Sequence, residues 1–175
     1  GNAGAVCLDT GIGRERVGAF LTALAARYKG HPALLAYDVW NECFYQPDIC
    51  YCAATREAFV AWLQERYASL EELRQTWRRY SLEDWGQIAI PKQHAPWPEC
   101  GDWLLFRKDN FYRQMAWRVE TLRAVDPNVL ITAHGLGNSL DWMFSHGSDH
   151  WQAAAQVDSY GFTFVQTREG NDPVT

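Results

Sequence analysis

The stretch from Ala33 to about Trp40, "ALLAYDVW", is nearly continuous in apolar, β-prone residues. Such a run is typical of a parallel strand whose two faces are both covered by other elements. It follows a segment from Arg14 to Lys29 whose apolar residues recur at helical spacing, and which Gly30 and Pro32 end. A helix that leads into a doubly covered strand predicts an α/β fold with a parallel sheet.

The same alternation continues along the chain. Residues 53–67 and about 103–125 have helical spacing, and Ser69 with Glu72 forms a capping box that opens another helix. Two further strands are predicted at 129–135, "VLITAHG", and at 156–164, "QVDSYGFTF". Strands joined by helices imply right-handed parallel crossovers. The chain is then either a small open α/β domain or the middle of an eight-stranded barrel whose flanking strands are missing.

One segment between these helices is expected to be a long loop. Residues 90–103, "IPKQHAPWPECGDW", contain Pro91, Pro96 and Pro98, which are expected to forbid regular structure.

Composition excludes several classes of protein. No apolar run among the 175 residues approaches the roughly 20 that cross a bilayer, so no membrane partner is expected. A net charge of -5 offers no basic field for nucleic acid. The first residues show neither the basic nor the apolar part of a signal peptide, so the chain begins either as a mature product or, as we favour, inside a longer protein. The sequence does not fix the compartment, and a cytoplasmic location is favoured. Assembly of the chain into a homo-oligomer is left open.

The predicted first strand ends in Asn41 and Glu42. In parallel α/β folds, reactive groups collect at the carboxyl ends of strands. Partial desolvation beside Trp40 and Tyr45 would help Glu42 to hold a proton for transfer to a leaving oxygen, and the Asn41 amide can donate or accept beside it. Alternatively, Glu42 merely caps or pairs with an arginine of the next helix, and the dipeptide alone does not decide between these roles.

The wider context resembles glycoside hydrolase family 42, the β-galactosidase family of retaining (β/α)₈-barrel enzymes. The resemblance runs from about residue 27 to 115 and more loosely through "VDSYGFTF"; its segments are "HPALLAYDVWNE", "CYC", "FVAWLQERYASLEELRQTW", "DWGQIAIP" and "DWLLFRKDNFYRQM". It implies that residues 1–175 are the central portion of a single TIM barrel, about strands four to six with their helices.

The resemblance also implies an activity, the hydrolysis of terminal β-linked sugars, with β-galactosides favoured as the carbohydrate substrate. Glu42 would be the acid/base, and Asn41 would bind the 2-hydroxyl of the sugar. The nucleophile ends the seventh strand in such enzymes, and the chain stops before it at Thr175. Two alternatives remain: a related glycosidase such as a β-mannanase, since "YDVWNE" is shared widely, or a non-catalytic carbohydrate-binding module.

Five cysteines exclude a fully paired disulfide framework. The reaction needs no cofactor, but the resemblance implies a structural zinc bound by four cysteines. Here Cys43, Cys50 and Cys52 are followed by Thr55 at the last expected place, so zinc is expected to bind weakly or to be absent. Alternatively these cysteines are ordinary thiols, or Cys43 pairs with Cys50 in an exported protein.

A fourth zinc ligand could come from Cys7, Cys100 or His94 only if the chain folds back. Two more residues are candidates for substrate binding. His134 ends the second predicted strand and either lines the pocket or caps its own loop. Trp142 either forms the floor of a sugar site or is core, as buried tryptophans usually are.

Overall fold

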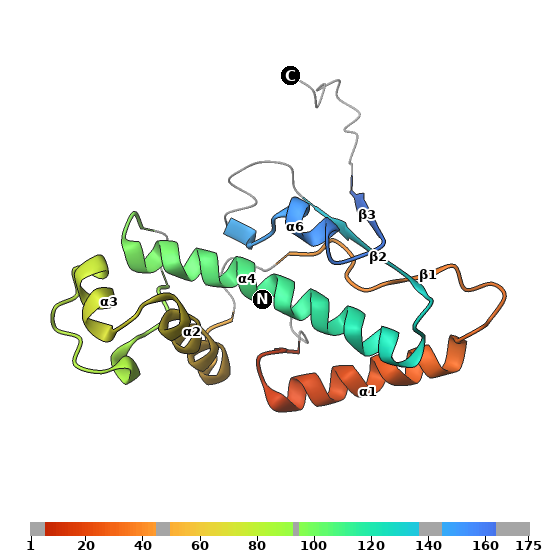
Figure 1. Cartoon of the computed structure of the whole chain (residues 1–175), viewed down its shortest axis with the longest axis horizontal. Helices are drawn as coiled ribbons and strands as arrows, with labels where there is room; N and C mark the ends of the chain where they lie inside the picture. Colours follow the sequence, from red (N-terminus) through yellow and green to blue (C-terminus); the bar gives the residue numbers. More distant parts are fainter. Residues whose placement is uncertain (1–5, 45–49, 93–94, 137–144, 164–175) are drawn as a thin grey trace, which may run out of the picture.

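The structure, a computed structural model, describes residues 6–44, 50–92, 95–136 and 145–163. In these segments a parallel sheet has the strand order β1-β2-β3, and helices are gathered mainly on one side of it (Figure 1). The strands are β1 (Ala36–Asp38), β2 (Leu130–Gly135) and β3 (Ser159–Phe162). The helices are α1 (Gly11–Tyr28), α2 (Ala53–Arg66), α3 (Leu70–Trp77), η1 (Trp85–Gln87), α4 (Pro98–Val125) and α6 (His150–Ala154).

Successive side chains of the strands point alternately to a face of the sheet that helices cover and to a face that they leave open. Tyr37, Ile131 and Ala133 are buried, and the first two pack with side chains of α1 and α4. Asp38 pairs in register with Thr132, and His134 follows two residues later. Because successive strand residues point to opposite faces, Asp38 and His134 lie on the face away from α1 and α4.

The long helix α4 runs from the region of α2 and α3 to α1 and the sheet (Figure 1), and its side chains belong to two parts of the core. Its later turns pack Val119 and Leu122 against α1 and the sheet. Its earlier turns pack Trp103 and Phe106 against α2, α3 and the segment around η1. The helix therefore connects the sheet to the helical region that follows the first strand.

The long loop expected at 90–103 is shorter than predicted. Helix α4 already begins at Pro98, with Trp97 as its N-cap. Proline is tolerated in the first turn of a helix because the N–H that it lacks would have no intrahelical partner there. The expectation that Pro98 forbids regular structure was therefore wrong.

The capping box at α3 is present, but the Glu72 side chain bonds a different backbone N–H from the one that the motif predicts. Ser69 Oγ accepts a hydrogen bond from the N–H of Glu72 at 3.2 Å, as predicted. The Glu72 carboxylate accepts from the N–H of Ala68, at 2.8 Å, rather than from that of Ser69. Among the described helices, none has the length and apolarity needed to cross a membrane.

Candidate active site and thiol cluster

The end of β1 is set by a side-chain turn. Asp38 Oδ1 accepts a hydrogen bond from the N–H of Trp40 at 3.2 Å, which turns the chain out of the strand. The Trp40 ring then stacks on Phe111 of α4, with 4.6 Å between the ring centroids, and the Arg118 guanidinium lies 3.8 Å from the Trp40 ring centroid. Packing on α4 therefore fixes where the chain goes next, which is into Asn41 and Glu42.

His134 of β2 holds the chain on both sides of that pair. Its N–H donates to the carbonyl of Trp40 at 3.4 Å, and its carbonyl accepts from the N–H of Cys43 at 2.9 Å. Asn41, which is exposed, and Glu42, which is half-buried, lie between the two contacts. Glu42 has a φ of 48°, a left-handed conformation that costs a non-glycine residue about 1–2 kcal/mol. Strained residues of this kind cluster at functional sites.

Cys43 lies beneath this turn in the core. Its side chain is fully buried, and Sγ is 3.4 Å from the hydroxyl of Tyr160, which is 2.7 Å from His150 Nδ1. Burial raises the pKa of the Cys43 thiol, and burial together with that thiol raises the pKa of the Tyr160 phenol. Cys43 is therefore a neutral, packed thiol that connects the Glu42 turn to β3.

A carboxylate–imidazole pair stands on the open face of the sheet. Asp38 Oδ2 is 3.0 Å from His134 Nδ1, and the two side chains keep 41% and 27% of their exposure. The pair joins β1 to β2 close to where both strands end. It is thus near the Asn41–Glu42 turn and accessible from the face that α1 and α4 leave open.

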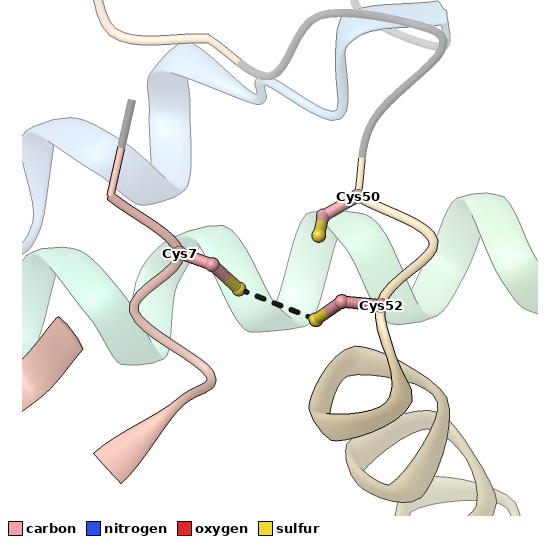
Figure 2. A group of neighbouring side chains, drawn as sticks. All are labelled: Cys7, Cys50 and Cys52. Atoms are coloured by element: carbon pink, nitrogen blue, oxygen red, sulfur yellow. Dashed lines mark hydrogen bonds between the residues drawn. The ribbon is translucent and has the colours of Figure 1, made fainter. Parts of the chain in front are cut away.

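Three thiols meet at the start of α2, where Cys52 is the N-cap. The Sγ atoms of Cys7, Cys50 and Cys52 all lie within 4.8 Å of one another, and those of Cys7 and Cys52 are 3.7 Å apart (Figure 2). Cys43, which the sequence analysis grouped with Cys50 and Cys52, is not a member of this cluster, because its side chain is held in the core against Tyr160. Cys7 takes that place from the segment before α1.

Thr55, in the first turn of α2, contacts two thiols of the cluster. Its buried hydroxyl lies 3.3 Å from Cys52 Sγ and 3.6 Å from Cys7 Sγ. The hydroxyl also donates to Asp9 Oδ2 at 2.6 Å. Asp9 Oδ1 accepts from the amides of Asn110 and Gln114 of α4, each at 2.9 Å. The cluster is therefore tied to the core through Asp9.

The cluster has three of the four donors of a structural zinc site. Tetrahedral zinc with Zn–S bonds of about 2.3 Å separates neighbouring sulfurs by about 3.8 Å, and the 3.7 Å between Cys7 and Cys52 matches this spacing. The next polar group beside two of these thiols is the hydroxyl of Thr55, which is not among the usual ligands of zinc. The three thiols could hold a metal, whereas a four-cysteine site does not fit these residues.

The thiols of the cluster differ in acidity. Burial raises the pKa of Cys7 to about 11. Burial also acts to raise the pKa of Cys52, but contacts with the hydroxyl and N–H of Thr55 and with the neighbouring thiols outweigh it and lower this pKa to about 7. A thiolate, the form that binds metals, is thus accessible in the cluster near neutral pH.

Several residues that the sequence suggested for the site do not lie in the turn or in the thiol cluster, or lie outside the described residues. Trp142, Tyr45 and His94 lie outside the described residues. Cys100 is buried in the first turn of α4 and does not belong to the thiol cluster. Sequence reasoning did not single out Asp9, Asp38 or Tyr160, whose contacts join segments far apart in the chain and leave no local pattern.

The fold and the turn together define a class. The chain is an α/β protein with an amide and a carboxylate, Asn41 and Glu42, just after the carboxyl end of a parallel strand, where α/β enzymes carry their reactive groups. Residues 1–172 match the family model of glycoside hydrolase family 42, described as β-galactosidase. The chain belongs to this family.

Relatives and solved structures agree with that membership. The chain is 32% identical to the β-galactosidase BglY of Alicyclobacillus acidocaldarius and 30% identical to the β-galactosidase GanA of Bacillus subtilis, over 75% and 87% of its length. It spans only 20% and 24% of those two proteins.

Two crystal structures of β-galactosidases resemble the chain. The enzyme of Bacillus circulans sp. alkalophilus superposes with a TM-score of 0.78 at 22% identity, over 93% of this chain and 25% of that one. The enzyme of Rahnella sp. R3 gives 0.73 at 26% identity, over 89% and 23%. The chain thus shares its fold with about a quarter of these enzymes.

Proposed function

We propose that this chain is the central part of a retaining β-galactosidase barrel, in which β1, β2 and β3 serve as strands four, five and six. The observation that carries the proposal is the family match over residues 1–172, which includes the Asn41–Glu42 turn at the carboxyl end of β1. The held, left-handed conformation of Glu42 supports a functional role for it, because such strain persists only where the surrounding structure enforces it.

Glu42 acts as the acid/base of the proposed reaction. Its protonated carboxyl gives a proton to the glycosidic oxygen while a second carboxylate, about 5 Å away, attacks the anomeric carbon and forms a glycosyl-enzyme. The aglycone leaves as an alcohol. Glu42, now a carboxylate, takes a proton from water as the water oxygen displaces the enzyme carboxylate, which regenerates both groups. The second carboxylate would come from a later strand of the full-length protein.

Other residues bind the sugar in this proposal. The exposed amide of Asn41 contacts the 2-hydroxyl, and His134 lies on the open face of the sheet beside the turn. Trp142 stays a candidate for the floor of the site. Hydrolysis itself needs no cofactor. We further propose that Cys7, Cys50 and Cys52 bind zinc only weakly, since Thr55 stands where a fourth thiolate would be needed.

The alternative functions are not favoured by the relatives. BglY and GanA are both named β-galactosidases, which gives no support to a β-mannanase or to a non-catalytic binding module. Assays of the full-length protein should nevertheless include mannan oligomers beside aryl β-galactosides. Hydrolysis of the mannan oligomers alone would show that the proposed substrate is wrong. Sugar binding without hydrolysis would show that the proposed activity is wrong.

The test of the proposal is Glu42→Gln in the full-length protein. A glutamine cannot protonate a leaving group, so hydrolysis of β-galactosides with poorly activated leaving groups should fall by about 10²–10⁴-fold. Galactosides with very acidic leaving groups, which need no protonation, should form the glycosyl-enzyme at a nearly normal rate. Glu57→Gln, on the exposed side of α2, is the matched control. Equal rates for wild type and Glu42→Gln on both substrates would refute the assignment.

A further inference from the structure

The Asp38–His134 pair lies near the ends of β1 and β2, beside the Asn41–Glu42 turn. Both residues lie on the strand face that α1 and α4 do not cover, and both side chains keep part of their exposure. Core packing explains their neighbours Tyr37 and Ala133, which are buried. It does not explain a partly exposed carboxylate and imidazole that face each other across two strands.

The same pair is connected to the catalytic turn through the backbone. His134 contacts Trp40 and Cys43 with its own N–H and carbonyl, on either side of Asn41 and Glu42. Asp38 uses one carboxylate oxygen for the N–H of Trp40 and the other for the imidazole. One hydrogen-bonded unit therefore carries both the His134 ring and the Glu42 residue, and it fixes the position of the ring relative to the turn that holds Glu42.

We infer that His134 binds a hydroxyl of the substrate through Nε2 and that Asp38 is the positioning residue that fixes its ring. The inference rests on the proposed function. A carboxylate accepts hydrogen bonds, so Nδ1 of the neutral ring carries the proton that it shares with Asp38. This leaves Nε2 as an acceptor. Sugar hydroxyls are donors, and an acceptor on a rigid strand selects the position and orientation of one of them.

The first test is His134→Asn in the full-length protein. An asparagine amide can stand in for Nδ1 and keep the contact with Asp38, but it has no atom at the place of Nε2. We expect KM for an aryl β-galactoside to rise about tenfold, the effect of one lost hydrogen bond, with a smaller change in kcat. The thermal unfolding midpoint should stay close to that of wild type, which separates loss of binding from loss of structure.

The second test is Asp38→Asn. The new amide can donate to Nδ1, which drives the ring proton to Nε2 and turns the acceptor into a donor. KM should then rise at least as much as in His134→Asn, although the His134 ring is intact. Ser159→Ala, an exposed position of β3 whose register partner is Thr132, serves as the control and should keep the wild-type KM.

The outcomes separate this inference from the proposed function. A wild-type KM in either His134→Asn or Asp38→Asn, in an enzyme that Glu42→Gln impairs, overturns the role of the pair and leaves the function standing. Normal hydrolysis by Glu42→Gln overturns the assignment of the acid/base. A full-length protein that hydrolyses no β-glycoside overturns both.

Discussion

Replacing Thr55 with cysteine should create the missing fourth donor of the thiol cluster. The hydroxyl of Thr55 lies 3.3 Å from Cys52 Sγ and 3.6 Å from Cys7 Sγ, close to the roughly 3.8 Å between sulfurs around zinc. A cysteine Sγ can occupy nearly the same position, since both side chains carry their hetero atom on Cβ. Thr55→Cys therefore needs little rearrangement to offer a tetrahedral set of thiolates.

The expected gain follows from the strength of complete sites. Structural zinc sites have apparent binding free energies of about 10–16 kcal/mol, so one of four thiolates contributes roughly 3 kcal/mol. Thr55→Cys should accordingly lower the zinc Kd by about 100-fold. Without zinc the variant should be less stable by about 1 kcal/mol, because the hydrogen bond from Thr55 to Asp9 is lost.

Competition with a chromophoric chelator measures the affinity, and metal analysis after dialysis measures the stoichiometry. Thr55→Ser is the matched control, since it keeps the hydroxyl and should not gain zinc. One tightly bound zinc per wild-type chain, or an unchanged Kd in Thr55→Cys, would refute the reasoning and point to a fourth ligand elsewhere in the full-length protein.

Two further predictions concern buried and surface carboxylates. Asp102 accepts from the hydroxyl of Tyr67 at 2.7 Å, and burial together with this carboxylate raises the pKa of Tyr67 to about 12. Asp102 also accepts from the indole N–H of Trp77 and pairs with Arg66. Asp102→Asn should cost about 2 kcal/mol, seen as a lower melting temperature, and an unchanged one would contradict the structural role of this carboxylate. Asp158 has a lowered pKa, because its carboxylate accepts from the N–H of Ile131 and pairs with Arg123. It therefore stabilises the fold above its unfolded pKa of about 4 and loses this effect as pH falls through its folded value. The difference in melting temperature between wild type and Asp158→Asn should shrink below about pH 4; a difference independent of pH would contradict this.

Local patterns were sufficient to predict most of the helices and strands. Apolar spacing located α1, α2 and β2, and the Ser69 capping box located the start of α3. The first strand is shorter than the apolar run around it, because the Asp38 carboxylate turns the chain at Trp40. Periodicity does not reveal a side chain that hydrogen-bonds its own backbone two residues ahead.

The candidate site was only partly predictable for a related reason. Asn41 and Glu42 could be found because they end an apolar run, and the strand end is where α/β folds gather reactive groups. The contacts that hold them come from His134 of another strand. Likewise Cys7 joins Cys50 and Cys52 only through the folding of distant segments, and the direction of Cys43 depends on the turn before it. Such long-range contacts have no signature in sequence spacing.

The most direct test of the acid/base assignment is to determine the anomeric configuration of the galactosyl azide that forms in the presence of azide. Glu42→Ala should lose most of its activity, and azide should restore turnover of an activated aryl β-galactoside. The small anion enters the space left by the acid/base and attacks the glycosyl-enzyme from that face, so a retaining enzyme yields β-galactosyl azide. An α-galactosyl azide would identify Glu42 as the nucleophile instead, and no effect of azide together with wild-type activity would remove Glu42 from the chemistry.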